Sequence, residues 1–124
     1  MSATSAISVY TGSGYELVRV ASTRKDLSAV TITSITGVWT PASAKKFRLM
    51  GGCISISAAA NVLFEDNAAG GAYFIFRTPK LLADTPYNFD LGNGYLSAAV
   101  NNILKATSSA AGAITGTLYG TEEE

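Results

Sequence analysis

The stretch that decides the predicted fold spans residues 38–67 and reads VWTPASAKKFRLMGGCISISAAANVLFEDN. After a start that contains a proline, residues 47–57 form a predicted strand, because in each half of this segment apolar side chains recur at every second position. A link of small residues leads to a second predicted strand at residues 61–65, which ends in an acidic turn. The pattern predicts a protein built from β-sheets.

The apolar residues of the first predicted strand change face halfway along it. Phe47 and Leu49 occupy odd positions, whereas Ile54 and Ile56 occupy even ones, and successive side chains of a strand point to opposite faces. The glycine pair at 51–52 tolerates the bulge or bend that such a change requires. We interpret the segment as a strand that crosses a corner between two sheets of a sandwich. The alternative is two short strands joined by a Gly-Gly turn.

Composition limits the domain count and the chemistry. A chain of 124 residues is expected to form one domain. Nine Lys and Arg balance nine Asp and Glu, three of which form a predicted acidic tail at 122–124. The remaining charges form no basic run, so nucleic-acid binding is not expected. The absence of His excludes His-dependent triads and His-ligated zinc, and Cys53 is predicted to be a buried core thiol.

No segment has the pattern of a targeting or membrane-spanning sequence. The first residues lack the basic start and the long apolar run of a signal peptide, and no apolar run reaches the length of about 18 residues that a spanning helix needs. We therefore expect synthesis in a cytoplasm and no membrane partner.

The rest of the chain also reads as short strands separated by turns. Residues 72–77 are almost all aromatic or β-branched, which predicts a strand buried on both faces. Asn-Gly at 93–94 predicts a hairpin between strands at 87–91 and 95–100, and a last hairpin is predicted between 103–107 and 113–119. Other predicted segments are a strand at 15–20, a charged loop at 22–26, a bending strand at 30–37 and a turn at 66–71.

About eight strands and no amphipathic helix predict an all-β, antiparallel sandwich with jelly-roll or Greek-key connections. The predicted domain covers 11–121, and several strand orders are compatible with the pattern. We expect the core to contain Leu49, Ile56, Phe64, Phe74, Phe76 and Leu118.

Residues 1–10 are predicted to form an arm outside the sandwich. The segment carries no charge, and residues 11–14 (TGSG) supply a hinge. Ten extended residues reach roughly 30 Å, enough to cross to a neighbouring subunit and add a strand there through the candidate assembly contacts Ile7, Val9 and Tyr10. The alternative is a first strand that pairs within its own sandwich.

Three segments resemble small β-sandwich virion proteins of tailed bacteriophages. They are WTPASAKKFRLMG at 39–51, VLFEDN at 62–67 and AITGTLYG at 113–120, so the similarity covers roughly 38–120. The resemblance implies a capsid decoration (cement) protein that binds the major capsid protein on the head surface, or another minor structural component of the virion, such as a neck- or tail-associated protein. Such proteins are often homotrimers and often extend a terminus to a neighbour. It implies no catalytic residue and no cofactor.

Other functional readings remain open from the residues. One is a carbohydrate- or receptor-binding module, for which Trp39 beside Pro41 is the candidate ligand-facing aromatic. Glu65, Asp66, Asp84 and Asp90 are interpreted as turn-forming carboxylates without calcium-loop spacing. The glycines form no phosphate loop, and no enzyme is predicted.

Overall fold

The structure is a computed structural model that describes the backbone of residues 5–10, 15–68 and 71–124, and the side chains of 21–67 and 72–124. The described residues form ten strands: β1 Ser5–Tyr10, β2 Tyr15–Val20, β3 Thr23–Thr31, β4 Thr36–Trp39, β5 Lys46–Ile56, β6 Val62–Ala68, β7 Gly71–Arg77, β8 Tyr87–Leu96, β9 Ile103–Ser108 and β10 Ala113–Glu123. In this part of the chain no helix is long and apolar enough to cross a membrane.

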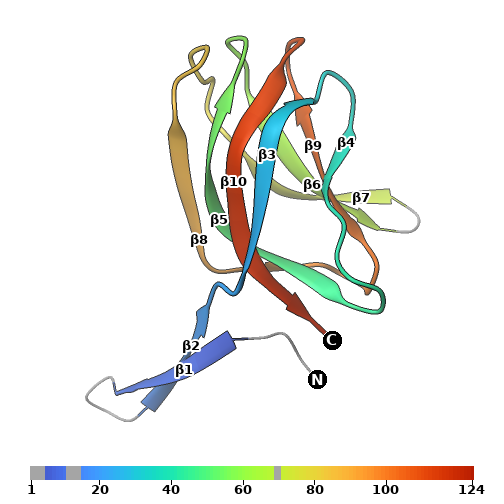
Figure 1. Ribbon diagram of the computed structural model, residues 1–124. Coiled ribbons are helices and arrows are strands. Elements are labelled where there is room, and N and C mark those ends of the chain that lie inside the picture. Colours follow the sequence, from blue (N-terminus) through green and yellow to red (C-terminus); the bar gives the residue numbers. More distant parts are fainter. Residues whose placement is uncertain (1–4, 11–14, 69–70) are drawn as a thin grey trace.

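Eight strands form two antiparallel four-stranded sheets, ordered β3-β10-β5-β8 and β4-β9-β6-β7, that pack face to face (Figure 1). The chain pairs its first sandwich strand with its last, its second with its seventh, and so on inward: β3 with β10, β4 with β9, β5 with β8 and β6 with β7. Successive pairs alternate between the sheets. This is the winding of a jelly roll, and it confirms the predicted fold class.

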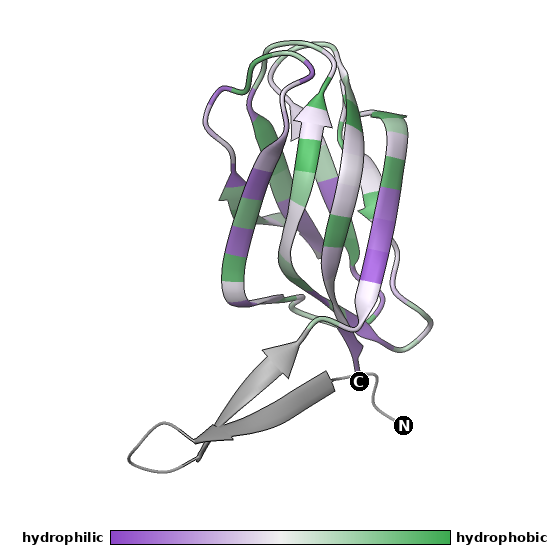
Figure 2. Ribbon diagram, turned by 60° about the vertical axis from the view of Figure 1, so that its left-hand side comes forward, coloured by the Kyte–Doolittle hydropathy of each residue, from purple (hydrophilic) through white to green (hydrophobic). Residues whose placement is uncertain are grey.

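The core lies between the two sheets and follows the alternation of hydrophobic and hydrophilic residues along the strands (Figure 2). Four of the six predicted core residues, Leu49, Ile56, Phe64 and Leu118, have 0% exposure. They are joined by further buried residues from both sheets, including Trp39, Phe47, Ile54, Val62, Leu104 and Ile114.

Residues 72–77 were predicted to be buried on both faces. This prediction is wrong, because β7 lies at the edge of its sheet. Phe76 pairs with Phe64 and stacks on Phe89 with ring centroids 5.1 Å apart, so it is half-buried. Phe74 is 62% exposed, and its predicted place in the core is wrong. The reason is a register shift in the β6–β7 pairing that leaves Ile75 as an extra residue, so that Phe74 and Phe76 face opposite sides.

A similar bulge explains the change of face in β5. The strand is continuous, and Met50 is one extra residue in its pairing with β10, whereas in its pairing with β8 the same residue stands opposite residues 91–94. The extra residue returns both halves of the strand to the same core, so the predicted corner crossing and the two-strand alternative are both wrong. Gly52 is required here, because a Cβ atom at this position would lie 2.6 Å from the carbonyl oxygen of Thr117.

Both predicted hairpins are wrong. The Asn-Gly pair lies inside β8, where residues 91–94 bulge out between the Asp90–Gly51 and Tyr95–Leu49 pairs. The 108–112 turn joins β9 in one sheet to β10 in the other. The turn signal at 108–112 thus marks the end of a strand correctly but does not say which strand becomes the partner, and the signal at 93–94 marks a bulge instead of a hairpin.

Two further segments differ from the prediction at the start of the sandwich. The predicted charged loop at 22–26 belongs to β3, which runs from Thr23 to Thr31. The predicted bending strand at 30–37 is divided between β3 and β4, which lie in different sheets. Ile32 is fully buried between them, so the link is itself part of the core.

The predicted arm is part of a two-stranded ribbon. Residues 5–10 form β1, which pairs antiparallel with β2 and joins neither four-stranded sheet. Residues 1–4 and the predicted hinge at 11–14 lie outside the described part of the chain. Figure 1 shows the ribbon beyond the end of the sandwich at which the C-terminus lies.

The contrast between β6 and β7 predicts very different costs for two similar substitutions. Phe64→Ala should lower the free energy of unfolding by about 3–5 kcal/mol, because it leaves a cavity in the core. Phe74→Ala, at an exposed position, should change it by less than about 0.5 kcal/mol. Urea unfolding of both variants measures the difference, and equal losses would contradict the assigned β6–β7 register.

Candidate functional site

Trp39 lies in the core and does not face a ligand. It is 1% exposed, and its ring packs on Phe47 with centroids 5.8 Å apart. The indole Nε1 donates a hydrogen bond to Oε2 of Glu122 at 2.9 Å, and Oε1 of the same carboxylate accepts from the backbone N of Ala42 at 3.2 Å. The prediction that Trp39 is an exposed aromatic is therefore wrong, because β10 extends far enough to supply the indole with an internal partner.

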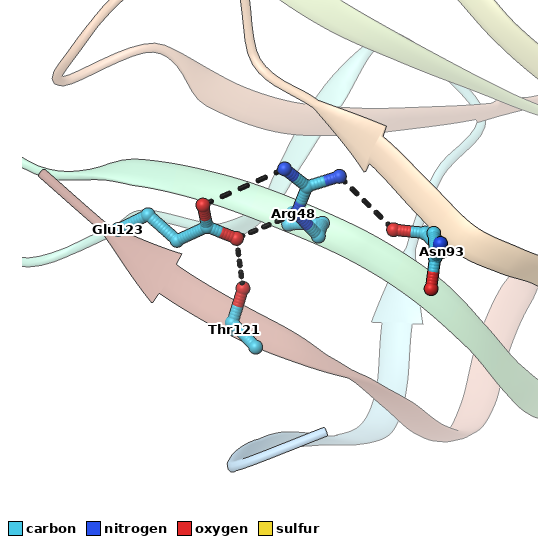
Figure 3. A network of polar contacts seen from close by, with 4 residues as sticks. All are labelled: Arg48, Asn93, Thr121 and Glu123. Atoms are coloured by element: carbon cyan, nitrogen blue, oxygen red, sulfur yellow. Dashed lines mark hydrogen bonds and ion pairs between the residues drawn. The ribbon is translucent and has the colours of Figure 1, made fainter. Parts of the chain in front are cut away.

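The prediction that residues 122–124 form an acidic tail is wrong, because the first two of them belong to β10. Glu122 and Glu123 pair with Phe47 and Lys46 as the final residues of β10. Arg48 donates from Nε and Nη2 to the carboxylate of Glu123, and Thr121 donates to the same carboxylate at 2.7 Å (Figure 3). The two charged side chains are only 11% and 10% exposed.

The same guanidinium also fixes the bulge of β8. Nη1 of Arg48 donates to the carbonyl oxygen of Asn93 at 3.0 Å (Figure 3). Nε and Nη2 bind Glu123 while Nη1 binds the β8 backbone, so one arginine links β5, β8 and β10. These charges stabilise the sandwich and are not available to an external ligand.

Asp66 is a buried structural carboxylate in β6 and does not form a turn. Its Oδ2 accepts from the Tyr95 hydroxyl at 2.9 Å and from the backbone N of Ala98 at 2.8 Å, and its Oδ1 accepts from Nδ2 of Asn102 at 2.9 Å. The side chain is 0% exposed. Three donors compensate for the loss of solvation of the carboxylate and hold the β8–β9 connection against β6.

The other candidate carboxylates do not come together. Glu65 lies on the outer face of β6 opposite Lys105, and Asp84 is exposed in a loop. Asp90 accepts from the backbone N of Gly92 at 2.8 Å, which confirms a turn-forming role within the β8 bulge. Among the described residues, no group of three His, Cys, Asp or Glu side chains could hold a metal ion.

Cys53 is exposed, and the prediction of a buried thiol is wrong. The bulge at Met50 turns Ile54 and Ile56 toward the core and therefore turns Cys53 to the outer face of β5. The predicted assembly contacts Ile7, Val9 and Tyr10 lie in β1 opposite Val18, Glu16 and Tyr15. Their side chains are outside the described part of the structure.

The four edge strands of the sandwich differ in how well they are protected against pairing with another chain. Edge strands are normally protected by charge, by bulges or by shortness. The β3 edge carries Arg24, Lys25 and Asp26, the β8 edge is interrupted by the bulge at 91–94, and β4 has only 4 residues.

The β7 edge has the weakest protection of the four. It runs over 7 residues and carries no charge before Arg77. Tyr73 is 53% exposed and Phe74 is 62% exposed, and a single bulge at Ile75 interrupts its inner pairing. We take this edge as the candidate assembly surface, because an uncharged strand with exposed aromatic residues is suited to pairing with another polypeptide.

A second candidate site is an open pocket on the outer face of the sheet β4-β9-β6-β7. It has a volume of about 410 Å³ and is lined by Asn61, Leu63, Arg77, Thr107, Ser108 and Ser109. Leu63 pairs with Arg77 on one side and with Thr107 on the other, which brings three strands together in one row. Sequence reasoning missed this site, because the row exists only once the strand registers are known.

Comparisons with known proteins give no family assignment: no family model, curated protein or solved structure matches the chain.

Removal of residues 122–124 should destabilise the sandwich by about 3–5 kcal/mol, because it leaves the Arg48 guanidinium buried without its carboxylate. Glu124→Gln is the matched control. The Glu124 side chain is 58% exposed and lies 3.9 Å from Lys45, so this change should cost less than about 0.5 kcal/mol. Thermal unfolding of both variants measures the difference, and an unchanged melting temperature after truncation would mean that the network contributes no stability.

Burial and, next, the hydrogen bond to Asp66 raise the pKa of Tyr95 from 10.0 to about 12. Because the folded-state pKa is the higher one, the stability contributed by the protonated hydroxyl is complete below about pH 10 and is lost as the pH rises through about 12. Ultraviolet titration of tyrosinate should show a late-titrating group that disappears in Tyr95→Phe. If the wild type differed from Tyr95→Phe only by one tyrosine that titrates in the ordinary range, the assigned contact would be contradicted.

Proposed function

We propose that the protein is a non-enzymatic structural virion protein that binds the major capsid protein of a tailed bacteriophage and stabilises the head surface, as a homotrimer. The observation that carries the proposal is the open β7 edge, with Tyr73 and Phe74 exposed on an uncharged strand. Such an edge gives a small domain a strip of backbone donors and acceptors beside apolar surface, which is suited to stable contact with another protein.

The use of the charged side chains supports a structural role. Asp66, Glu122, Glu123 and Arg48 are all engaged in contacts inside the domain. A general acid or base needs a carboxylate that can reach a substrate, and these groups are held by internal donors. The jelly-roll winding, which occurs in capsid proteins as well as in lectins, and the sequence resemblance at 39–51, 62–67 and 113–120 favour the virion role.

The ribbon of β1 and β2 supplies a second element for assembly. A two-stranded ribbon is only marginally stable alone in water, and this ribbon joins neither sheet of its own sandwich. In the proposed assembly it packs on a neighbouring chain, where additional strand pairing or packing stabilises it.

Capsid binding tests the function directly. Purified protein mixed with undecorated capsids should bind stoichiometrically at symmetry-equivalent sites, as seen by cryo-electron microscopy. Phe74→Lys should weaken binding by at least about tenfold, because it places a charge on the contact edge. Leu82→Lys is the control, since Leu82 is 70% exposed in the β7–β8 loop and is not part of the β7 strand. Labelling of the neck or tail, with none on the shell, would replace the head role by neck or tail association.

Deletion of residues 1–10 tests the ribbon. Because β1 pairs with β2 and joins neither four-stranded sheet, the melting temperature should change little, whereas trimer formation and capsid binding should weaken. Analytical ultracentrifugation and the capsid-binding assay measure these two properties. A large loss of domain stability would place residues 1–10 among the elements that hold the sandwich together and would contradict the assembly role.

A further inference from the structure

The outer-face pocket adjoins the β7 edge at Arg77 but includes none of the residues of the Arg48, Glu122, Glu123 and Asp66 networks that hold the sandwich. It lies where β6 begins and where β7 and β9 end, and its volume of about 410 Å³ is within the range of small-ligand sites. Leu63 forms an apolar part of its lining, and Asn61, Arg77, Thr107 and Ser109 supply polar groups around it.

The backbone that carries these polar groups is held firmly. Asn61 donates from its backbone N to Oγ of Ser109 at 2.9 Å and from Nδ2 to the carbonyl oxygen of Thr78 at 3.0 Å. The backbone N of Ser109 donates to the carbonyl oxygen of Asn61 at 3.0 Å. A ligand therefore meets groups that are already ordered, which reduces the entropy lost on binding.

Several polar groups of the pocket have hydrogen-bonding capacity to spare. Arg77 forms no ion pair with any carboxylate in the described part of the chain, and its guanidinium lies 5.9 Å from the ring centroid of Phe74. Oγ1 of Thr107 is the single buried side-chain polar atom without a hydrogen-bond partner among the described residues. An unpaired buried hydroxyl requires an explanation, and Thr107 is among the residues that line the pocket.

Charge and chemistry together define the class of ligand. Glu65 and Lys105 face each other on the next row of the same sheet, so they balance and leave the charge of Arg77 to dominate at the pocket. A guanidinium binds a carboxylate through two parallel hydrogen bonds. The nearby hydroxyls and the Asn61 amide suit a polyol, which donates and accepts through several hydroxyl groups.

We propose that this pocket binds an acidic saccharide unit, with its carboxylate on Arg77 and its hydroxyl groups on Asn61, Thr107 and Ser109. The site would give the protein a glycan-binding activity on the face of the sheet that β7 borders. This activity does not depend on capsid binding, and Trp39 has no part in it.

Titration of the full-length protein with glucuronate and with N-acetylneuraminate, followed by NMR chemical shifts, tests the proposal. Saturable binding of at least one acidic sugar is expected, with shifts centred on the pocket, and Arg77→Gln should weaken it by about tenfold or more. Arg24→Gln is the control. Arg24 is 72% exposed and forms an ion pair with Asp26 in β3, on the sheet that does not carry the pocket, so this variant should bind as the wild type does.

Thr107→Val separates a binding role from a structural one. Because its hydroxyl has no internal partner, the substitution should leave the melting temperature unchanged or raise it, and it should still weaken saccharide binding. Unchanged sugar affinity in this variant would overturn the assigned role of Thr107 in the site.

Three results would overturn the proposal as a whole. The first is that glucose binds as tightly as glucuronate, which would remove the role of the carboxylate. Acetate or inorganic phosphate could compete as well as the acidic sugars do, which would leave a simple anion site. A glutamate-rich peptide could bind in an Arg77-dependent manner while every sugar fails, which would assign the pocket to an acidic protein segment.

Discussion

The position of β10 between β3 and β5 is the constraint on which the rest of the sandwich depends. The last strand of the chain pairs with β3 on one side and with β5 on the other over nearly its full length. Without it, β3 would have no partner in its sheet. Where β10 pairs with β5, a Cβ atom on Gly120 would collide with the carbonyl oxygen of Arg48. The two strands therefore approach closely only because this residue is glycine.

Glu122 and Glu123 stabilise this closure, so their carboxylates are not part of an exposed site. Glu122 ties the end of β10 to Trp39 and to the β4–β5 connection, and Glu123 ties it to Arg48. On the other sheet, Asp66 holds the β8–β9 connection in the same way. Each carboxylate is partly or fully removed from water, which is favourable only when donors replace the lost solvation.

Sequence periodicity predicted the fold class and most strand positions, and it failed where a bulge reversed the alternation. A period-two pattern assigns faces correctly only up to the first extra residue. Met50 reverses the alternation in β5 and Ile75 reverses it in β7. Cys53 was expected inside because it is a lone cysteine, and Phe74 because residues 72–77 are almost all aromatic or β-branched, yet the bulges leave Cys53 on the outer face and Phe74 at an open edge. The glycine pair at 51–52 did signal an irregularity, but not its direction.

Long-range pairing was the part that local signals could not provide. The turn at 108–112 was recognised, yet whether β9 and β10 share a sheet depends on β10 having two better partners in β3 and β5. The pocket residues Leu63, Arg77 and Thr107 come from three strands and have no motif in sequence. They meet only because the β6–β7 and β6–β9 registers align them.

The two sheets consequently differ in what they leave exposed. In β3-β10-β5-β8 the edges carry charges or a bulge, and the networks of Arg48, Glu122 and Glu123 hold the sheet closed. In β4-β9-β6-β7 an uncharged edge remains, together with a pocket whose Arg77 forms no ion pair with a carboxylate of the described residues, and both include β7. Arg77 ends the uncharged strand and also lines the pocket. The same residue therefore limits how far an added strand can extend along the edge, and it supplies the positive charge at the pocket. Any partner that pairs along the full length of β7 must therefore accommodate a cation at that end, and an acidic side chain there would compete for Arg77 with a ligand in the pocket.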